Sequence, residues 1–258
     1  MFGITLLAIN GIYPGSGVTT GNMDRQMRGA EQTTVRWFRH VGSAAMLAFA
    51  LSAALALTPP SARADSTTND VASDCFSEHS QRRIPGCTAL LEGGAKLSTA
   101  ERSLAYAMRA LAYSLQGQYT EALNDYDKAI SLRPDFDVAL NNRAWSLFKM
   151  KRFSEAMKDV EKALKIAPWS AHAFDTRAHL HQAEGRPRNA LQDYILAMRF
   201  GGEKLVKLYQ CGLEAHGLFT GKVDGIETDD LLQALATCVR DDQCDPLPPD
   251  EECRQPTS

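Results

Sequence analysis

One pattern occurs three times in this chain, at a spacing of 34 residues. Arginine recurs in the same register at Arg109, Arg143 and Arg177. The other recurring positions hold alanine or aspartate, and they are Ala110, Ala144, Ala178, Ala122, Ala156, Ala190, Asp125, Asp159, Asp193, Ala129, Ala163 and Ala197. A period of this length is typical of stacked copies of one supersecondary unit, so it restricts the fold more than any other feature. The units are residues 103–136, 137–170 and 171–204.

Each unit has the residues that a pair of packed helices needs. Small side chains such as Ala110 and Ala122 let two helix axes approach, and aromatic residues such as Tyr126 fill the space beside them. Gly117 lies where the chain must reverse between two helices, and Pro134 closes the unit. These positions resemble the tetratricopeptide repeat (TPR) family. The resemblance implies that each unit is a helix–turn–helix hairpin and that the fold is an all-α solenoid.

The segment before the repeats has the pattern of an export signal. A basic flank, an uncharged apolar run of 17 residues and a small-x-small site follow one another. This order predicts a signal peptide over residues 1–64, with cleavage after Ala64 and a periplasmic or secreted product that has no membrane span. The alternative is a membrane anchor, although a span needs about 20 residues. Residues 1–26 are atypical of a signal peptide, so we expect translation to start at Met23 or Met27.

All six cysteines follow the predicted signal peptide, and none lies inside the repeats. An even number in an exported chain indicates disulfides, and no CxxC-type spacing indicates a metal site. Cys75 and Cys87 are close together and isolated, which predicts that they pair. This bond would tie a short helix over residues 84–91, within an N-terminal cap of residues 65–102, to the repeats. The sequence leaves the other pairing open, and we favour Cys211–Cys238 with Cys244–Cys253.

Charge and motifs exclude several classes of function. Residues 65–258 carry 23 Lys and Arg and 29 Asp and Glu, a net charge near −6. This balance argues against nucleic-acid binding, which uses a basic face. The sequence has no nucleophile elbow, phosphate-binding loop or metalloprotease helix motif. We therefore expect no enzyme activity and no cofactor.

The TPR resemblance implies that the first helix of each hairpin lines a concave groove. Helical periodicity gives this groove an apolar end, a middle with amides and aromatic rings, and an end with imidazole and carboxylate groups. The candidate partner-binding residues are Met108, Leu111, Asn141, Asn142, Trp145, Phe148, His172, Asp175 and His179. Amides can bond the backbone of an extended peptide, and Trp145 can anchor an apolar side chain unless it belongs to the core. Lys and Arg, which clamp a C-terminal carboxylate in some members of the family, are absent from these positions.

Two other patterns have a structural and a functional interpretation. The recurring Arg and Asp residues could form a binding ladder, but we favour an ion pair that locks the two helices of each unit. Asp175 and His179 share a helix face and could chelate a metal. His172 lies about 10 Å from His179 along the axis, too far to bind the same ion. We therefore favour a polar groove face over a metal site.

Residues 205–240 carry a second resemblance, to the small peptidoglycan-binding domain of cell-wall hydrolases and envelope proteins. The matching residues are Val206, Tyr209, Gln210, Leu213, Gly217, Leu218, Phe219, Gly221, Val223, Asp224, Gly225, Ile226, Ala234 and Leu235. The resemblance implies a candidate wall-ligand loop at Phe219, Asp224 and Gly225. Cys238 departs from the pattern, because it takes the place of a core aromatic residue. The alternative is that this module is a disulfide-pinned cap for the repeats.

The sequence thus predicts an all-α, helical-hairpin solenoid of three TPR repeats. An N-terminal capping helix precedes the repeats, and a small disulfide-linked helical module follows them. Residues 241–258 form a Pro-rich tail stapled by Cys244 and Cys253. We expect a scaffold of the bacterial cell envelope that binds a protein or peptide partner in its groove. The alternative is a peptidoglycan-binding envelope protein whose repeats act as an adaptor.

Overall fold

The computed structural model describes residues 70–94, 96–241 and 243–247. The predicted signal peptide and the predicted translation start lie outside these residues. Within them, every regular element is a helix, as predicted, and no helix combines the length and apolar character that crossing a membrane requires. The helices are α4 (Ser80–Glu92), α5 (Thr99–Leu115), α6 (Tyr119–Leu132), α7 (Asp137–Lys149), α8 (Phe153–Ile166), α9 (Ala171–Ala183), α10 (Pro187–Ala215) and α11 (Asp229–Cys238).

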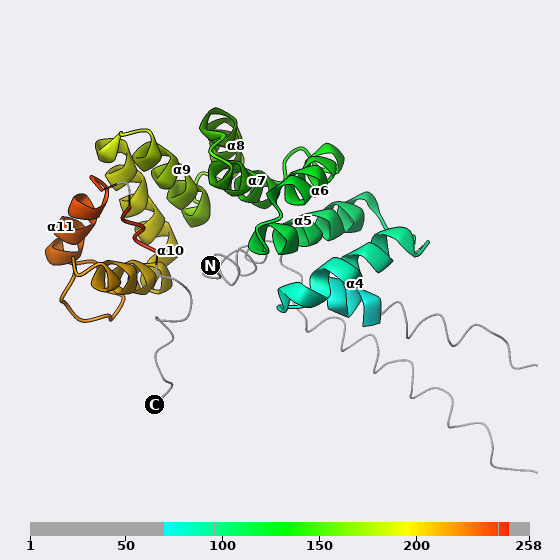
Figure 1. The fold of residues 1–258 in the computed structure, drawn as a ribbon, viewed down its shortest axis with the longest axis horizontal. Helices are drawn as coiled ribbons and strands as arrows, with labels where there is room; N and C mark the ends of the chain where they lie inside the picture. The colour runs from blue at the N-terminus through cyan, green and yellow to red at the C-terminus, as the bar shows by residue number, and fades with distance from the viewer. Residues whose placement is uncertain (1–69, 95, 242, 248–258) are drawn as a thin grey trace, which may run out of the picture.

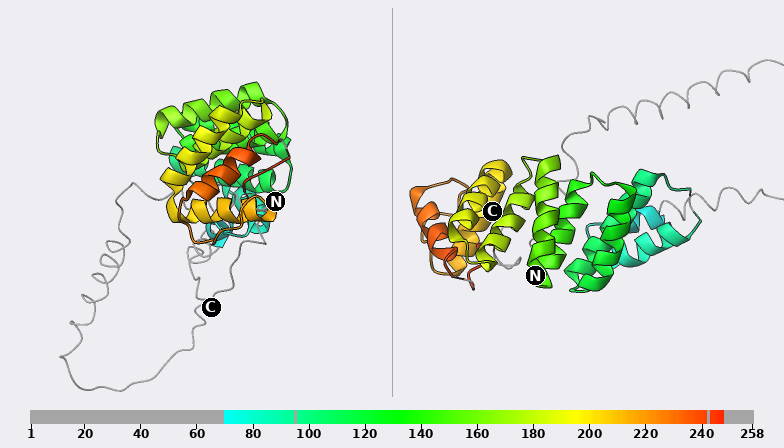
Figure 2. Two further views of the ribbon diagram at one scale, coloured as in Figure 1. Left: turned by 90° about the vertical axis from the view of Figure 1, so that its left-hand side faces the viewer. Right: turned by 90° about the horizontal axis from the view of Figure 1, so that it is seen from above.

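The helices form three hairpins that stack side by side. α5 packs on α6, α7 on α8, and α9 on α10, while α4 and α11 pack at the two ends of the stack. Figure 1 shows an arch in which α6 and α8 lie on the outer side and α5, α7 and α9 lie nearer the inner side. In the right-hand view of Figure 2 the colours follow sequence order along the long axis. The predicted solenoid of helical hairpins is therefore confirmed.

Small residues occupy the helix crossings of every hairpin. The six alanines at these crossings have no exposed surface, and they are Ala110, Ala122, Ala144, Ala156, Ala178 and Ala190. Fully buried rings such as Tyr126 and Tyr194 lie in the same hydrophobic core. Larger side chains at these crossings would strain the packing or separate the helix axes. The repeated alanines therefore set the distance between the two helices of each unit.

Each hairpin contains one bidentate ion pair between its helices. In the second repeat, Arg143 Nε donates to Asp159 Oδ2 and Nη2 donates to Oδ1, each over 2.7 Å. Arg177 and Asp193 make the same two bonds in the third repeat, and the first repeat has an equivalent pair. The aspartates are almost fully buried. The structural interpretation of the recurring Arg and Asp residues is therefore confirmed.

The turn inside each hairpin requires a left-handed backbone conformation. Gly117 has a φ of +75° and Gly185 a φ of +69°. The second repeat has Lys151 at the matching position with a φ of +59°, and Lys151 is the non-glycine residue with positive φ in the described part of the chain. This conformation costs an L side chain about 1–2 kcal/mol. The turn geometry is therefore retained in all three repeats despite the change of residue.

The disulfide predicted before the repeats is present, and the helix that it ties down is longer than predicted. Cys75 and Cys87 form a disulfide, and α4 ends at Glu92, just before the glycines expected to stop it. α4 begins at Ser80, four residues before the predicted start. A Cβ atom on Gly86 would lie 2.6 Å from the backbone nitrogen of Cys75. Glycine therefore lets the disulfide-linked segment lie directly against α4.

The C-terminal module continues the core of the repeats. Gly202 interrupts α10 with non-helical angles (φ 63°, ψ −158°), which redirects the chain after the third hairpin. Beyond this kink, Leu205, Tyr209 and Leu213 belong to the same buried cluster as the repeat alanines. Thr228 caps the N-terminus of α11, and its hydroxyl accepts a hydrogen bond from the backbone N–H of Leu231, as expected for a helix start.

The favoured pairing of the C-terminal cysteines is wrong. Cys238, at the end of α11, bonds to Cys244 with their Cα atoms 5.3 Å apart, instead of Cys211. The turn after α11 brings Cys244 back to the helix end, and the sequence carries no signal of this return. Cys211 is also disulfide-bonded, and Cys253 lies outside the described residues.

Candidate functional site

The predicted partner-binding residues all lie on α5, α7 and α9, nearer the inner side of the arch (Figure 1). Asn141 and Trp145 of α7 line one small cavity, of about 20 Å³, together with His172 and Asp175 of α9. Phe148 stacks on Trp145, with ring centres 5.2 Å apart. The structure therefore brings together the predicted residues of the second and third repeats.

The remaining predicted residues are buried on their helices. Met108 and Leu111 are buried on α5, and Met108 packs in a cluster with the disulfide of the N-terminal cap. Asn142 is buried on α7, and its side-chain oxygen lies 3.5 Å from the amide nitrogen of Asn141. Met108 therefore supports the cap rather than the cavity.

His179 is the charged centre of the third repeat. Its Nδ1 lies 2.8 Å from the backbone oxygen of Asp175, and its Nε2 lies 3.0 Å from Oδ1 of Asp245. A backbone carbonyl and an ionised carboxylate can only accept hydrogen bonds, so this geometry favours a proton on each nitrogen. The ring of Trp145 lies edge-on to the imidazole at 5.2 Å. The hydroxyl of Tyr209 donates to Oδ1 of Asp175 over 2.5 Å.

The surroundings of His179 raise its pKa to about 9 from an ordinary 6.5. Burial alone would lower this pKa, but the carboxylates of Asp175 and Asp245 outweigh burial. Burial raises the pKa of Asp175, opposed by His179 and the Tyr209 hydroxyl. Burial would also raise the pKa of Asp245, but His179 outweighs burial and lowers it. The site therefore holds a cationic imidazole at neutral pH.

We expect this imidazolium to make stability depend on pH. A group whose pKa is higher in the folded state stabilises fully below its unfolded value and loses that effect as pH rises through the folded value. The contribution of His179 should therefore be complete below about 6.5 and fall away toward about 9. Melting temperatures measured across this window should decline more steeply for the wild-type chain than for His179→Gln. Parallel curves for the two chains would contradict a charged His179.

Gln182 holds the C-terminal segment against the third repeat. Its Nε2 donates to the backbone oxygens of Asp241 and Cys244, each over 2.7 Å, and its Oε1 accepts from the Tyr194 hydroxyl. Gln182 is not among the predicted residues, although it lies three residues after His179 on the same helix and helical spacing could have found it. No local pattern indicates that residues 243–247 return to this face.

Asn141 lines the cavity and carries a buried hydrogen-bond acceptor. The residue is 7% exposed, and its Oδ1 has no hydrogen-bond partner among the described residues. Leu205 and Leu247 close the same cavity. A buried acceptor without a donor is costly and uncommon in folded proteins, so it marks a place where a ligand N–H would be stabilised.

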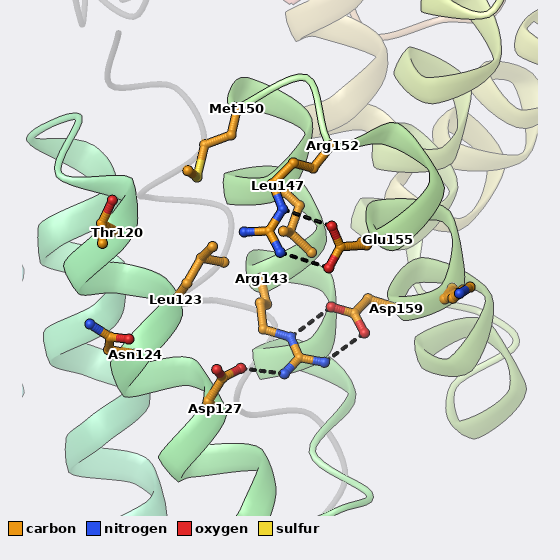
Figure 3. A pocket seen from close by; sticks show the side chains of 11 residues that line it. Thr120, Leu123, Asn124, Asp127, Arg143, Leu147, Met150, Arg152, Glu155 and Asp159 are labelled. Atoms are coloured by element: carbon orange, nitrogen blue, oxygen red, sulfur yellow. Dashed lines mark hydrogen bonds and ion pairs between the residues drawn. The ribbon is translucent and has the colours of Figure 1, made fainter.

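A second, larger cavity of about 450 Å³ lies between α6, α7 and α8 (Figure 3). Arg143 in this cavity pairs with both Asp127 and Asp159. Arg152 pairs with Glu155 through two hydrogen bonds of 2.7 Å. Because these arginines and carboxylates already neutralise one another, the cavity presents little unpaired charge to a ligand. We therefore do not assign it as the binding site.

The loop that resembles a wall-ligand loop is held by Gln210. Its Oε1 accepts from the backbone N–H groups of Asp224 and Gly225, and its Nε2 donates to Asp224 Oδ1. Phe219 is buried, with 4% of its surface exposed. The three predicted loop residues therefore have structural partners, and their role toward a ligand stays a prediction.

The residues suggested for a metal site have other partners. Both ring nitrogens of His179 face acceptors. Within residues 70–94, 96–241 and 243–247, no group of three or more His, Cys, Asp or Glu side chains is placed to hold a metal ion.

Comparison with known proteins supports the assignment of the first two units. Residues 103–136 and 138–170 match the tetratricopeptide repeat family. One matching solved structure is the first TPR domain of Spaghetti (RPAP3) bound to the HSP90 peptide SRMEEVD. It has 26% identity and a TM-score of 0.38, over 39% of this chain and 80% of that chain. Another is the MamA RS-1 ArsTM double mutant, with 16% identity and a TM-score of 0.46, over 56% of this chain and 79% of that chain. No curated protein matches this chain.

Proposed function

We propose that this chain is a non-enzymatic scaffold that binds a protein or peptide partner through the face formed by α7 and α9. The observation that carries the proposal is the buried, unused acceptor of Asn141 in a cavity that Trp145 also lines. An acceptor for a backbone N–H beside an aromatic ring is what an extended peptide needs for hydrogen bonding and for anchoring a side chain. We place this activity in the bacterial cell envelope, on the basis of the export pattern of residues 1–64.

Peptides selected from a random library against the full chain should test the proposal. Trp145→Ala should lower the affinity for the selected peptides by at least about tenfold, because aromatic anchors in buried contacts dominate binding energy. Trp169 offers a matched control, since it lies in the turn between α8 and α9 and is 68% exposed. Trp169→Ala should leave the affinity unchanged. Fluorescence anisotropy of labelled peptides measures both effects.

The melting temperatures of both variants show whether a loss of affinity comes from a lost contact or from unfolding of the chain. If Trp145→Ala unfolds the chain, Asn141→Leu tests the same cavity by removing its acceptor while keeping its volume similar. Equal affinities for the wild-type chain and a folded variant of either kind would refute the groove as the binding surface.

A second candidate function, peptidoglycan binding, is favoured by one observation. Gln210, Asp224 and Gly225 match the second resemblance, and they form one hydrogen-bonded unit. Co-sedimentation of the full chain with purified sacculi tests this candidate. Sedimentation that Asp224→Ala abolishes would move the function to the C-terminal module, whereas no sedimentation would leave that module as a cap.

A further inference from the structure

The chain's own C-terminal segment lies on the face where we place the partner. Asp245 reaches His179 through its side chain, and its backbone oxygen accepts from Nε2 of His216 over 3.0 Å. Leu247 lines the same small cavity as Asn141 and Trp145. Gln182 and the Cys238–Cys244 disulfide hold the segment immediately before these residues. Residues 245–247 form a turn, in which Oδ1 of Asp245 also accepts a hydrogen bond from the backbone N–H of Leu247 over 3.0 Å. This turn therefore occupies the face already, through one carboxylate contact and one aliphatic contact.

The carboxylate contact has the features of a recognition site. His179 is 6% exposed and is oriented by the backbone oxygen of Asp175, so its Nε2 points in a fixed direction. The side chain of Asp245 is 51% exposed, so the carboxylate reaches the imidazole from the solvent side. Another carboxylate could take its place without opening the core of the repeats.

The aliphatic contact fills its cavity incompletely. With Leu247 in place, about 20 Å³ remains among Trp145, Thr176 and Leu205. Asn141 lines this cavity, and its Oδ1 has no donor from any described residue. The segment is therefore an imperfect occupant, and a ligand that also donates a hydrogen bond to Asn141 would bind better.

We infer that the partner presents an acidic turn with an aspartate and an aliphatic residue two positions later, and that Asp245–Leu247 occupies this subsite until the partner displaces it. The inference rests on the proposed function and names the chemistry of its partner. A tethered segment competes at an effective concentration in the millimolar range, so it weakens the apparent affinity of any partner for the wild-type chain. Removing the tethered contacts should therefore expose the subsite.

The test uses the full chain and a labelled peptide that copies residues 243–252, with serine in place of Cys244. The double variant Asp245→Ala/Leu247→Ala should bind this peptide at least about tenfold more tightly than the wild-type chain does. The same peptide with alanine at both anchor positions should not bind the double variant. Asp230→Ala, a change at an exposed carboxylate of α11, is the control and should behave as wild type.

A double variant that keeps its melting temperature but binds the peptide no better than wild type would overturn the inference. If the double variant does not fold, Leu247→Ala alone gives the same comparison at the aliphatic contact. The proposed function is judged separately, by library peptides that depend on Trp145. If such peptides exist but lack the acidic and aliphatic pair and are indifferent to Leu247→Ala, the inference fails and the proposed function stands.

Discussion

Replacing Tyr209 with alanine should lower the free energy of unfolding by about 3–5 kcal/mol, because the change leaves a cavity in a fully packed core. Tyr209 has no exposed surface. Its ring lies edge-on to Tyr194 with centres 5.6 Å apart, and its hydroxyl donates to the buried carboxylate of Asp175. The residue joins the second part of α10 to α9, so its loss should loosen the C-terminal module from the third repeat.

Urea denaturation followed by circular dichroism measures this effect, and two other variants divide it into parts. Tyr209→Phe keeps the ring but removes the donor to Asp175, and should cost about 1–3 kcal/mol. Ile226 is 59% exposed in the same module, so Ile226→Ala should change stability by less than about 0.5 kcal/mol. Equal shifts for Tyr209→Ala and Ile226→Ala would show that the module does not share the core of the repeats.

Replacing Arg143 with alanine should lower the free energy of unfolding by about 3 kcal/mol, because it leaves a buried carboxylate without its cation. Asp159 is 7% exposed and takes two hydrogen bonds from Arg143. The Arg143 side chain is 22% exposed, so we expect the lower end of the range for buried pairs. The double variant Arg143→Ala/Asp159→Ala should cost less than the sum of the two single changes, because it leaves no unpaired charge.

The exposed pair of Arg152 and Glu155 provides a matched control beside the same cavity. Arg152→Ala should change stability by less than about 1 kcal/mol, since exposed ion pairs contribute little. Neither arginine lines the cavity of Asn141 and Trp145, so library peptides should bind both variants as they bind wild type. A loss of peptide binding in folded Arg143→Ala would instead support the binding ladder that the sequence left as an alternative.

The repeats could be predicted from sequence because their constraints recur. An alanine at a helix crossing and an Arg–Asp pair across a hairpin must appear in every unit, so their period reveals their role. The Cys75–Cys87 bond was also predictable, because the two residues are close in sequence and separate from the other cysteines. Lys151 shows the limit of this reasoning, since the neighbouring structure imposes a left-handed turn on a residue that does not favour it.

The candidate site was predictable only in part. Helical spacing placed Asn141, Trp145 and Asp175 on one face, and these three residues line one cavity. Asp245 contacts His179, and Leu247 lines a cavity with Asn141 and Trp145, all of which lie more than sixty positions earlier in the chain. No periodicity records such a contact, because a tail that folds back obeys none of the spacing rules of helices. The disulfide between Cys238 and Cys244 was not predicted either, because it also depends on how the tail folds back.

Hydrogen–deuterium exchange of the full chain, with and without a library-selected peptide, shows directly whether the partner binds on α7 and α9. We expect slower exchange in α7 and α9 when the peptide is bound, and faster exchange in residues 243–247 as the segment is displaced. Protection confined to α6 and α8, around the cavity of Figure 3, would contradict the account and move the binding surface to the outer side of the arch.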